Sequence, residues 1–198
     1  ALVEISPTDY YVVDLFRVSK LFDYRAFWLD AMCCAAASRF VAKAASKRDR
    51  VGVFAGGLLH RVGQVAIAEV APDQYGKVGR KLTGPELIGA EERVFGIAHP
   101  EAGYELASHW ELPAEIAEPI RFYNRPHLAE EAGESVAIVA LGEVLTRAVG
   151  SKHEENRELF TGLESALTEL RLDEESAEAM IEDFLARRNE AFQDLPIF

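Results

Sequence analysis

Residues 27–45 read FWLDAMCCAAASRFVAKAA, and this stretch decides the class of the fold. Alanine and other apolar residues recur there at helical spacing, and neither glycine nor proline interrupts them. Strand-like alternation is nearly absent from the rest of the chain, residues 10–16 (YYVVDLF) being the one ambiguous segment. We therefore predict an all-α protein that folds as a compact helical bundle.

A second apolar helix is predicted at residues 50–60, RVGVFAGGLLH, with Asp49 as its cap. Gly52, Gly56 and Gly57 lie within it, and glycines weaken a helix. Their presence indicates that this helix packs very closely against its neighbours.

Other helices are marked by their ends. Thr83, Pro100 and Pro113 each stand where a helix can begin, and Asp173 can cap an amphipathic helix near the end of the chain. Pro119 lies inside a predicted helix, where we expect a kink or a break.

The composition excludes some partners. The chain has 198 residues, enough for one well-buried core, and a net charge of −12 from 33 acidic and 21 basic residues. An acidic surface repels phosphate backbones and anionic lipids, and residues 46–50 (SKRDR) are the longest basic run. We therefore expect no binding to nucleic acid or membranes.

Cys33 and Cys34 are adjacent, and neighbouring helical residues cannot form a disulfide without severe strain. We expect two reduced cysteines on a buried helix, which indicates the cytoplasm. No signal-peptide pattern begins the chain, and no apolar run approaches the ~18 residues of a membrane-spanning helix. Because the chain opens without Met, we expect a fragment of a longer protein.

The residues 56–68, GGLLHRVGQVAIA, place His60 and Arg61 together at the end of an apolar helix. A histidine followed by an acid in such a place is suited to metal binding. Here the second residue is a cation with no lone pair to donate.

Four phrases occur in order along the chain: FDYRAFWLDA, FAGGLLHRVGQ, ERVFGIAHPEAGYELASHWELPAEIAEPIRFYN and VAIVALGEVLTRAVG. Together they resemble the HDOD family, bacterial signalling domains related to the HD-type metal-dependent phosphohydrolases. The likeness runs from about Phe22 to Gly150 and is most specific in 92–123. It implies one HDOD-like domain over 1–198, comprising the remnant of an N-terminal lobe (1–21), a core (22–150) and C-terminal helices (151–198). Trp110 resembles the family's aromatic residue and is expected to pack the end of its helix on the core.

Active HD proteins hold a divalent ion with a histidine, a His-Asp pair and a later aspartate, and the ion activates water. The resemblance places the first histidine at Asp30, where FWLDA stands for a typical FWRHS. It places the His-Asp pair at His60 and Arg61. The last aspartate falls at Glu143, since VALGE stands for a VHLAD-like phrase. Three of the four positions are altered.

Arg61 reverses a charge in this set. A guanidinium within a few ångströms of a divalent ion adds a repulsion of several kcal/mol even at an effective dielectric constant of ~20. We therefore expect the metal affinity of this set to be lost, leaving no metal, no cofactor and no catalytic residue.

The altered residues support two interpretations. In the first, Arg61 pairs with both Asp30 and Glu143, and a buried ion-pair cluster replaces the metal. In the second, Arg61 turns outward into solvent and Asp30 only lines a surface. His60 is expected to bond a backbone carbonyl. His99 is expected to cap the helix that follows it, the alternative being a ligand pocket shared with Arg61.

The leading hypothesis is therefore a non-catalytic signalling domain that acts through contacts with protein partners, neighbouring signalling domains or a second copy of itself. One alternative is a phosphohydrolase or phosphodiesterase that holds a metal with Asp30, His60 and Glu143. Another is a receptor that binds a nucleotide through Arg61.

Overall fold

The computed structural model describes residues 22–45, 51–78, 82–150, 160 and 162–193. Every element in these ranges is helical, which confirms the predicted class. Residues 10–16 and Asp49 lie outside the described residues. The elements are α2 (Tyr24–Ala44), α3 (Val51–Leu59), α4 (Val62–Val70), α5 (Pro72–Tyr75), α6 (Gly84–Phe95), α7 (His99–His109), α8 (Ala114–Phe122), η1 (Pro126–Leu128), α9 (Gly133–Gly150), α10 (Glu164–Leu170) and α11 (Glu174–Gln193).

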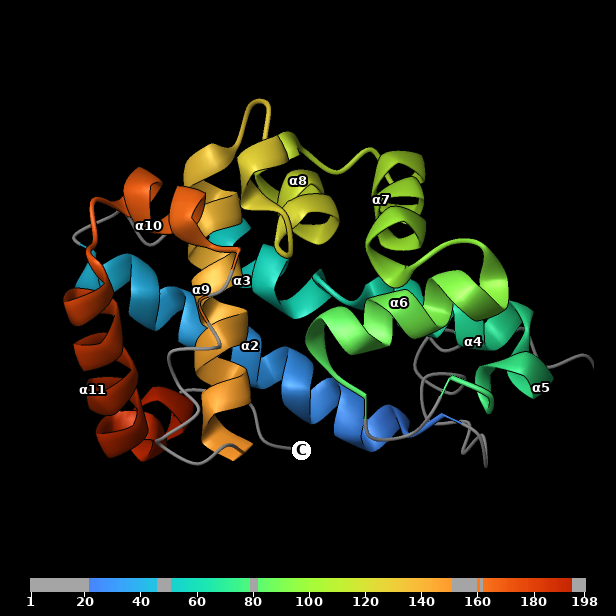
Figure 1. The fold of residues 1–198 in the computed structure, drawn as a ribbon, viewed down its shortest axis with the longest axis horizontal. Coiled ribbons are helices and arrows are strands. Elements are labelled where there is room, and N and C mark those ends of the chain that lie inside the picture. The colour runs from blue at the N-terminus through green and yellow to red at the C-terminus, as the bar shows by residue number, and fades with distance from the viewer. Residues whose placement is uncertain (1–21, 46–50, 79–81, 151–159, 161, 194–198) are drawn as a thin grey trace, which may run out of the picture.

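The helices are arranged around two long ones, α2 and α9, which pack against each other (Figure 1). In the view of Figure 1, α10 and α11 lie on the left, α4, α5 and α6 lie on the right, and α3 and α8 lie between. Helix α3 packs on α2, α8 and α9, so its C-terminal end is surrounded by other helices. This position brings the turn between α3 and α4 into the interior.

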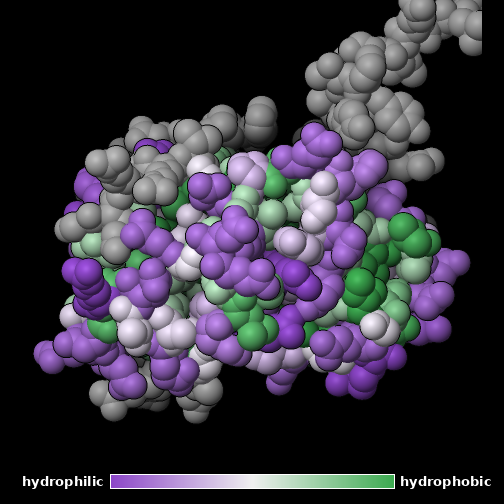
Figure 2. Space-filling view, turned by 90° about the horizontal axis from the view of Figure 1, so that it is seen from above, coloured by the Kyte–Doolittle hydropathy of each residue, from purple (hydrophilic) through white to green (hydrophobic). Residues whose placement is uncertain are grey.

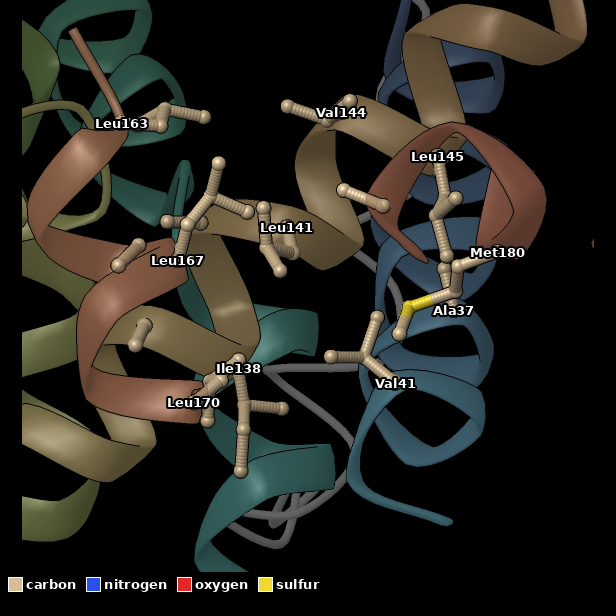
Figure 3. Packing of buried hydrophobic residues seen from close by; sticks show 14 of the residues in the cluster. Ala37, Val41, Ile138, Leu141, Val144, Leu145, Leu163, Leu167, Leu170 and Met180 are labelled. Atoms are coloured by element: carbon tan, nitrogen blue, oxygen red, sulfur yellow. The ribbon is translucent and has the colours of Figure 1, made fainter. Parts of the chain in front are cut away.

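The largest core cluster joins α2, α9, α10 and α11 (Figure 3). Val41, Ile138, Leu145 and Phe184 are at most 2% exposed. Each such side chain contributes ~1.5–3 kcal/mol when it leaves water, so this cluster anchors α9 firmly against α2. Glu143 of α9 is thereby held at a fixed depth in the bundle.

Glycines let the helices approach closely, as predicted for α3. A Cβ atom on Gly57 would lie 2.8 Å from Ser38 Oγ and 2.9 Å from Ala35 Cα, both on α2. On α9, a Cβ atom on Gly142 would lie 2.3 Å from the same Ser38 oxygen. Helices α2, α3 and α9 therefore meet at Ser38, one helical turn from Cys34.

The predicted helix ends are partly confirmed. Asp173 Oδ1 accepts a hydrogen bond from Ser176 N at 2.8 Å, which caps α11. Thr83 and Pro113 occupy N-cap positions without a side-chain capping bond, and Pro100 follows the first residue of α7.

Helix α8 continues through Pro119, which is buried there, so the expected break is absent and a kink stays a prediction. A proline removes only one backbone hydrogen bond from a helix. The expectation for Trp110 is wrong. Trp110 is 48% exposed rather than packed on the core, because α7 ends at His109 and the chain turns away there.

Candidate functional site

His60 and Arg61 form the turn between α3 and α4. The His60 ring is fully buried, and its Nδ1 lies 2.7 Å from the carbonyl oxygen of Gly57. A carbonyl oxygen only accepts hydrogen bonds, so Nδ1 must carry a proton and donate it. The expected carbonyl bond therefore exists, and it turns Nε2 toward α2 and α9.

Nε2 of His60 lies 3.1 Å from Oε2 of Glu143 on α9. Burial acts to raise the pKa of Glu143, but the hydrogen bond and charge of His60, together with the charge of Arg61, lower it to about 2. The carboxylate is thus ionised. His60 and Glu143 form a buried polar contact between the end of α3 and the middle of α9.

Arg61 turns neither fully inward nor out into solvent. Its guanidinium donates from Nε and Nη2 to the side-chain oxygen of Gln64, at 2.8 and 3.0 Å, in the amide orientation that satisfies both groups. Its Nη1 lies 3.9 Å from Oδ2 of Asp30. The Arg61 side chain is 13% exposed and the Asp30 side chain 59%.

The observed distances agree in part with each of the two interpretations of the sequence. Arg61 pairs with Asp30, as the cluster interpretation expects, and it does not point into solvent. Glu143, however, takes its hydrogen bond from His60. Burial raises the pKa of Asp30, although the charge of Arg61 opposes this effect.

Cys34 also belongs to this site, a role that no motif in the sequence predicted. Its ligand atom and those of His60 and Glu143 all lie within 4.8 Å of one another. Among the described residues, Asp30 is not part of such a group. The metal set proposed for the enzyme alternative, which used Asp30, is therefore wrong in one member. The sequence did hold a signal for Cys34. Cys34 lies four residues after Asp30 on the same helix, so the two residues share a helix face.

A second buried chain of polar groups lies beside the first. Nδ1 of His99 lies 2.5 Å from Oε2 of Glu91, and Nε2 lies 2.6 Å from the Tyr123 hydroxyl. Burial lowers the pKa of His99, so the ring is neutral: Nδ1 donates to Glu91, and Nε2 accepts from the hydroxyl. The Tyr123 ring also meets the edge of the His60 ring, with centroids 4.9 Å apart.

The expected cap by His99 is therefore wrong. His99 is the first residue of α7, Ala98 occupies the N-cap without a side-chain capping bond, and the backbone N–H of His99 donates to Glu91 Oε2 at 2.8 Å. Both ring nitrogens of His99 are already hydrogen-bonded to protein groups, so the ring offers no free donor or acceptor to a ligand pocket. Sequence reasoning missed Glu91 and Tyr123, which are close to His99 only in the folded chain.

The four positions that the resemblance assigns to the HD set do not together fit a divalent ion. Arg61 brings a fixed positive charge, and Asp30 faces this charge at the edge of the site. Only His60 and Glu143 of the four remain together as potential ligands.

The family model described as "HDOD domain" matches residues 8–126. The chain belongs to the HDOD family. The match includes the His60-Arg61 turn and the segment 92–123, whose phrases carried the resemblance in the sequence. It ends before Glu143, which the fold brings to the site.

Solved structures share this HDOD fold. An HDOD domain protein of unknown function from Geobacter sulfurreducens aligns with a TM-score of 0.69 and 22% identity, over 94% of this chain and 68% of that one. A protein from Shewanella amazonensis SB2B, proposed to be a phosphohydrolase, aligns with a TM-score of 0.59 and 18% identity, over 86% of this chain and 68% of that one. The MmoQ response regulator of Methylococcus capsulatus (strain Bath) aligns with a TM-score of 0.58 and 21% identity, over 87% of this chain and 68% of that one. At these identities the likeness concerns the fold.

An uncharacterised protein of Treponema pallidum (strain Nichols) is 29% identical over 96 residues. The aligned part covers 46% of this HDOD chain and 18% of that protein. The chain thus matches only a small part of this relative's length.

Proposed function

We propose that this HDOD domain is a non-catalytic regulatory module of the bacterial cytoplasm, which signals through contacts with other proteins or with neighbouring domains. One observation carries the proposal: Arg61 stands where an HD enzyme needs a metal-binding carboxylate, and Gln64 and Asp30 hold its guanidinium in place.

Hydrolysis at an HD site needs a divalent ion that binds both water and a phosphoryl oxygen. In this chain the charge of Arg61 opposes an ion at the position that the HD aspartate would occupy. Both ring nitrogens of His60 are hydrogen-bonded, to Gly57 and to Glu143, and Asp30 faces the guanidinium of Arg61.

A nucleotide receptor is less well supported. Anion recognition by arginine depends on a guanidinium whose paired N–H groups are free to meet the phosphate. Nε and Nη2 of Arg61 are bonded to Gln64, and Nη1 faces Asp30. A phosphate would have to displace both partners.

The surface is compatible with protein contacts. The net charge of −12 disfavours nucleic acid and anionic lipid, and no helix in the described part of the chain has the length and apolar character to cross a bilayer. Figure 2 shows green apolar patches among purple polar residues, the larger on the side of α4 to α6. Large apolar side chains that are exposed include Leu29, Val70, Ile97, Trp110, Leu128 and Val149.

Cross-linking in a bacterial host tests whether the domain acts through protein contacts or through a reaction at the HD positions. The full-length protein that contains this domain is expressed with a tag, either unchanged or with Asp30→Asn, and cross-linked partners are quantified. We expect the same protein partner at the same yield from both forms, because no reaction at the HD positions is needed. A domain that captures no partner, or whose partner is lost with Asp30→Asn, would contradict the proposal.

A further inference from the structure

We propose that Cys34, His60 and Glu143 form a closed binding site for a soft divalent transition ion of the zinc class. The three residues come from α2, from the turn after α3 and from α9, so an ion there would tie these three elements together. The inference does not rest on the proposed function, because a closed structural or sensory ion is compatible with a module that performs no chemistry.

The geometry is close to that of a bound ion. The Cys34 sulfur, a His60 ring nitrogen and a Glu143 carboxylate oxygen lie within 4.8 Å of one another, and Nε2 to Oε2 is 3.1 Å. Ligand bonds of ~2.0–2.3 Å in a tetrahedral site put donors roughly 3.3–3.7 Å apart. Closing the remaining gap requires a side-chain movement of about one ångström.

The His60 ring is already oriented as a metal ligand. Zinc-binding histidines usually donate the other ring N–H to a carbonyl or carboxylate, and this bond fixes the tautomer. Nδ1 of His60 donates in this way to the Gly57 carbonyl at 2.7 Å. Nε2, the atom left for the ion, then faces Glu143.

The donors select the ion. One sulfur, one nitrogen and one oxygen suit zinc and similar soft transition ions, whereas magnesium and calcium prefer oxygen alone. This set differs from the HD positions, because Cys34 supplies the sulfur while Asp30 and Arg61 take no part. A thiolate, a carboxylate and a neutral imidazole balance the two charges of the ion, and Asp30 offsets Arg61.

The site is also closed. Cys34 and His60 have no exposed surface, and Glu143 is 6% exposed. A water molecule can complete the coordination, but a phosphate ester has no access to it. The ion would therefore bind without catalysing hydrolysis.

Binding must release a proton. A cysteine binds a metal ion as its thiolate, so the ion displaces the proton of the Cys34 thiol. The hydrogen bond between His60 Nε2 and Glu143 also gives way to bonds from each group to the ion.

Titration of the chelator-treated full chain tests the site, and adjacent cysteines provide a matched control. Cys33 is also partly buried on α2 but is outside the group of three. We expect wild type and Cys33→Ala to bind one zinc and to show the sulfur-to-metal charge-transfer band when Co²⁺ replaces zinc. Cys34→Ala should lose the band and weaken zinc binding by about 100-fold or more. Substoichiometric zinc in wild type, or a band that survives Cys34→Ala but not Cys33→Ala, would overturn the proposal.

Zinc-edge X-ray absorption gives a second measurement that needs no variant. Wild type should show one sulfur ligand at ~2.3 Å beside nitrogen and oxygen ligands, and a zinc shell without sulfur would overturn the proposal. If Cys34→Ala does not fold, as judged by circular dichroism, this spectrum decides. Zinc that binds in this way to a protein with no phosphoesterase activity supports both proposals, whereas absence of binding removes this one alone.

Discussion

His60 Nε2 lies 3.1 Å from Glu143 Oε2, and this pair joins the end of α3 to the middle of α9 inside the bundle. Since Nδ1 of the same ring donates to Gly57, the imidazole is held at both ends. Two residues 83 positions apart in sequence thus form the central polar contact of the site.

This pair makes stability depend on pH in the acid range. The pKa of Glu143 falls from 4.5 to about 2 on folding, so the pair stabilises the protein fully above pH 4.5 and loses this effect as the pH falls toward 2. The shift corresponds to about 3 kcal/mol. In chelator-treated protein, Glu143→Gln should lower the free energy of unfolding at pH 7 by up to this amount and flatten its slope between pH 4.5 and 2.

Denaturant unfolding at several pH values measures this effect. The control is Glu105→Gln, because Glu105 is an exposed residue of α7 and its loss should leave the slope unchanged. If Glu143→Gln keeps the wild-type slope, the buried partners of Glu143 do not stabilise its carboxylate.

The Tyr123 hydroxyl is predicted to stabilise the second polar chain. Tyr123→Phe removes the donor 2.6 Å from His99 Nε2 and leaves a buried acceptor without a partner. We expect a loss of about 1–3 kcal/mol in the free energy of unfolding. The control, Tyr104→Phe, keeps the ring on which Arg121 stacks and should change stability by less than about 0.5 kcal/mol. Equal effects of the two substitutions would contradict the hydrogen bond.

Gly63 marks the closest approach of α4 and α7. A Cβ atom there would lie 2.1 Å from the His99 carbonyl oxygen and 2.5 Å from Gly103 N, both of them backbone atoms that cannot yield. Gly63→Ala should therefore lower the melting temperature clearly, with a cost of about 1–3 kcal/mol or more. Gly89→Ala on α6 meets only the flexible end of Arg93 at 3.4 Å and should stabilise the helix by ~0.5–1 kcal/mol. Thermal unfolding of both variants measures these effects. A Gly63→Ala variant with the melting temperature of wild type would contradict the close packing of α4 on α7.

Local sequence signals predicted the fold well. The uninterrupted apolar periodicity of residues 27–45 became α2, and the glycines of residues 50–60 became the close contacts of α3. The failures concern tertiary context, since Pro119 is tolerated inside α8 and Trp110 remains half-exposed. Propensity describes a helix in isolation, whereas packing decides whether a proline is accommodated or an aromatic ring is covered.

The site was predicted in part. The resemblance named Asp30, His60, Arg61 and Glu143, and the fold brings them into one region. Which acidic side chain contacts which basic one depends on how deeply each is buried, and the spacing of residues in the sequence does not encode this depth.

The three residues that were missed share one cause. Cys34, Glu91 and Tyr123 acquire their roles through contacts between helices that are distant in sequence. Tyr123 lies in the segment 92–123, but nothing in that segment indicates its contact with His99.

The most direct measurement is the hydrolysis of phosphate mono- and diesters, including nucleotides, by purified protein supplied in turn with Mg²⁺, Mn²⁺, Fe²⁺, Ni²⁺ and Zn²⁺. Because the sequence resemblance places Arg61 at the HD aspartate position, we predict that no ion raises the rate of the wild-type protein above that of His60→Ala. Turnover that requires one of these ions and disappears with His60→Ala would contradict the account.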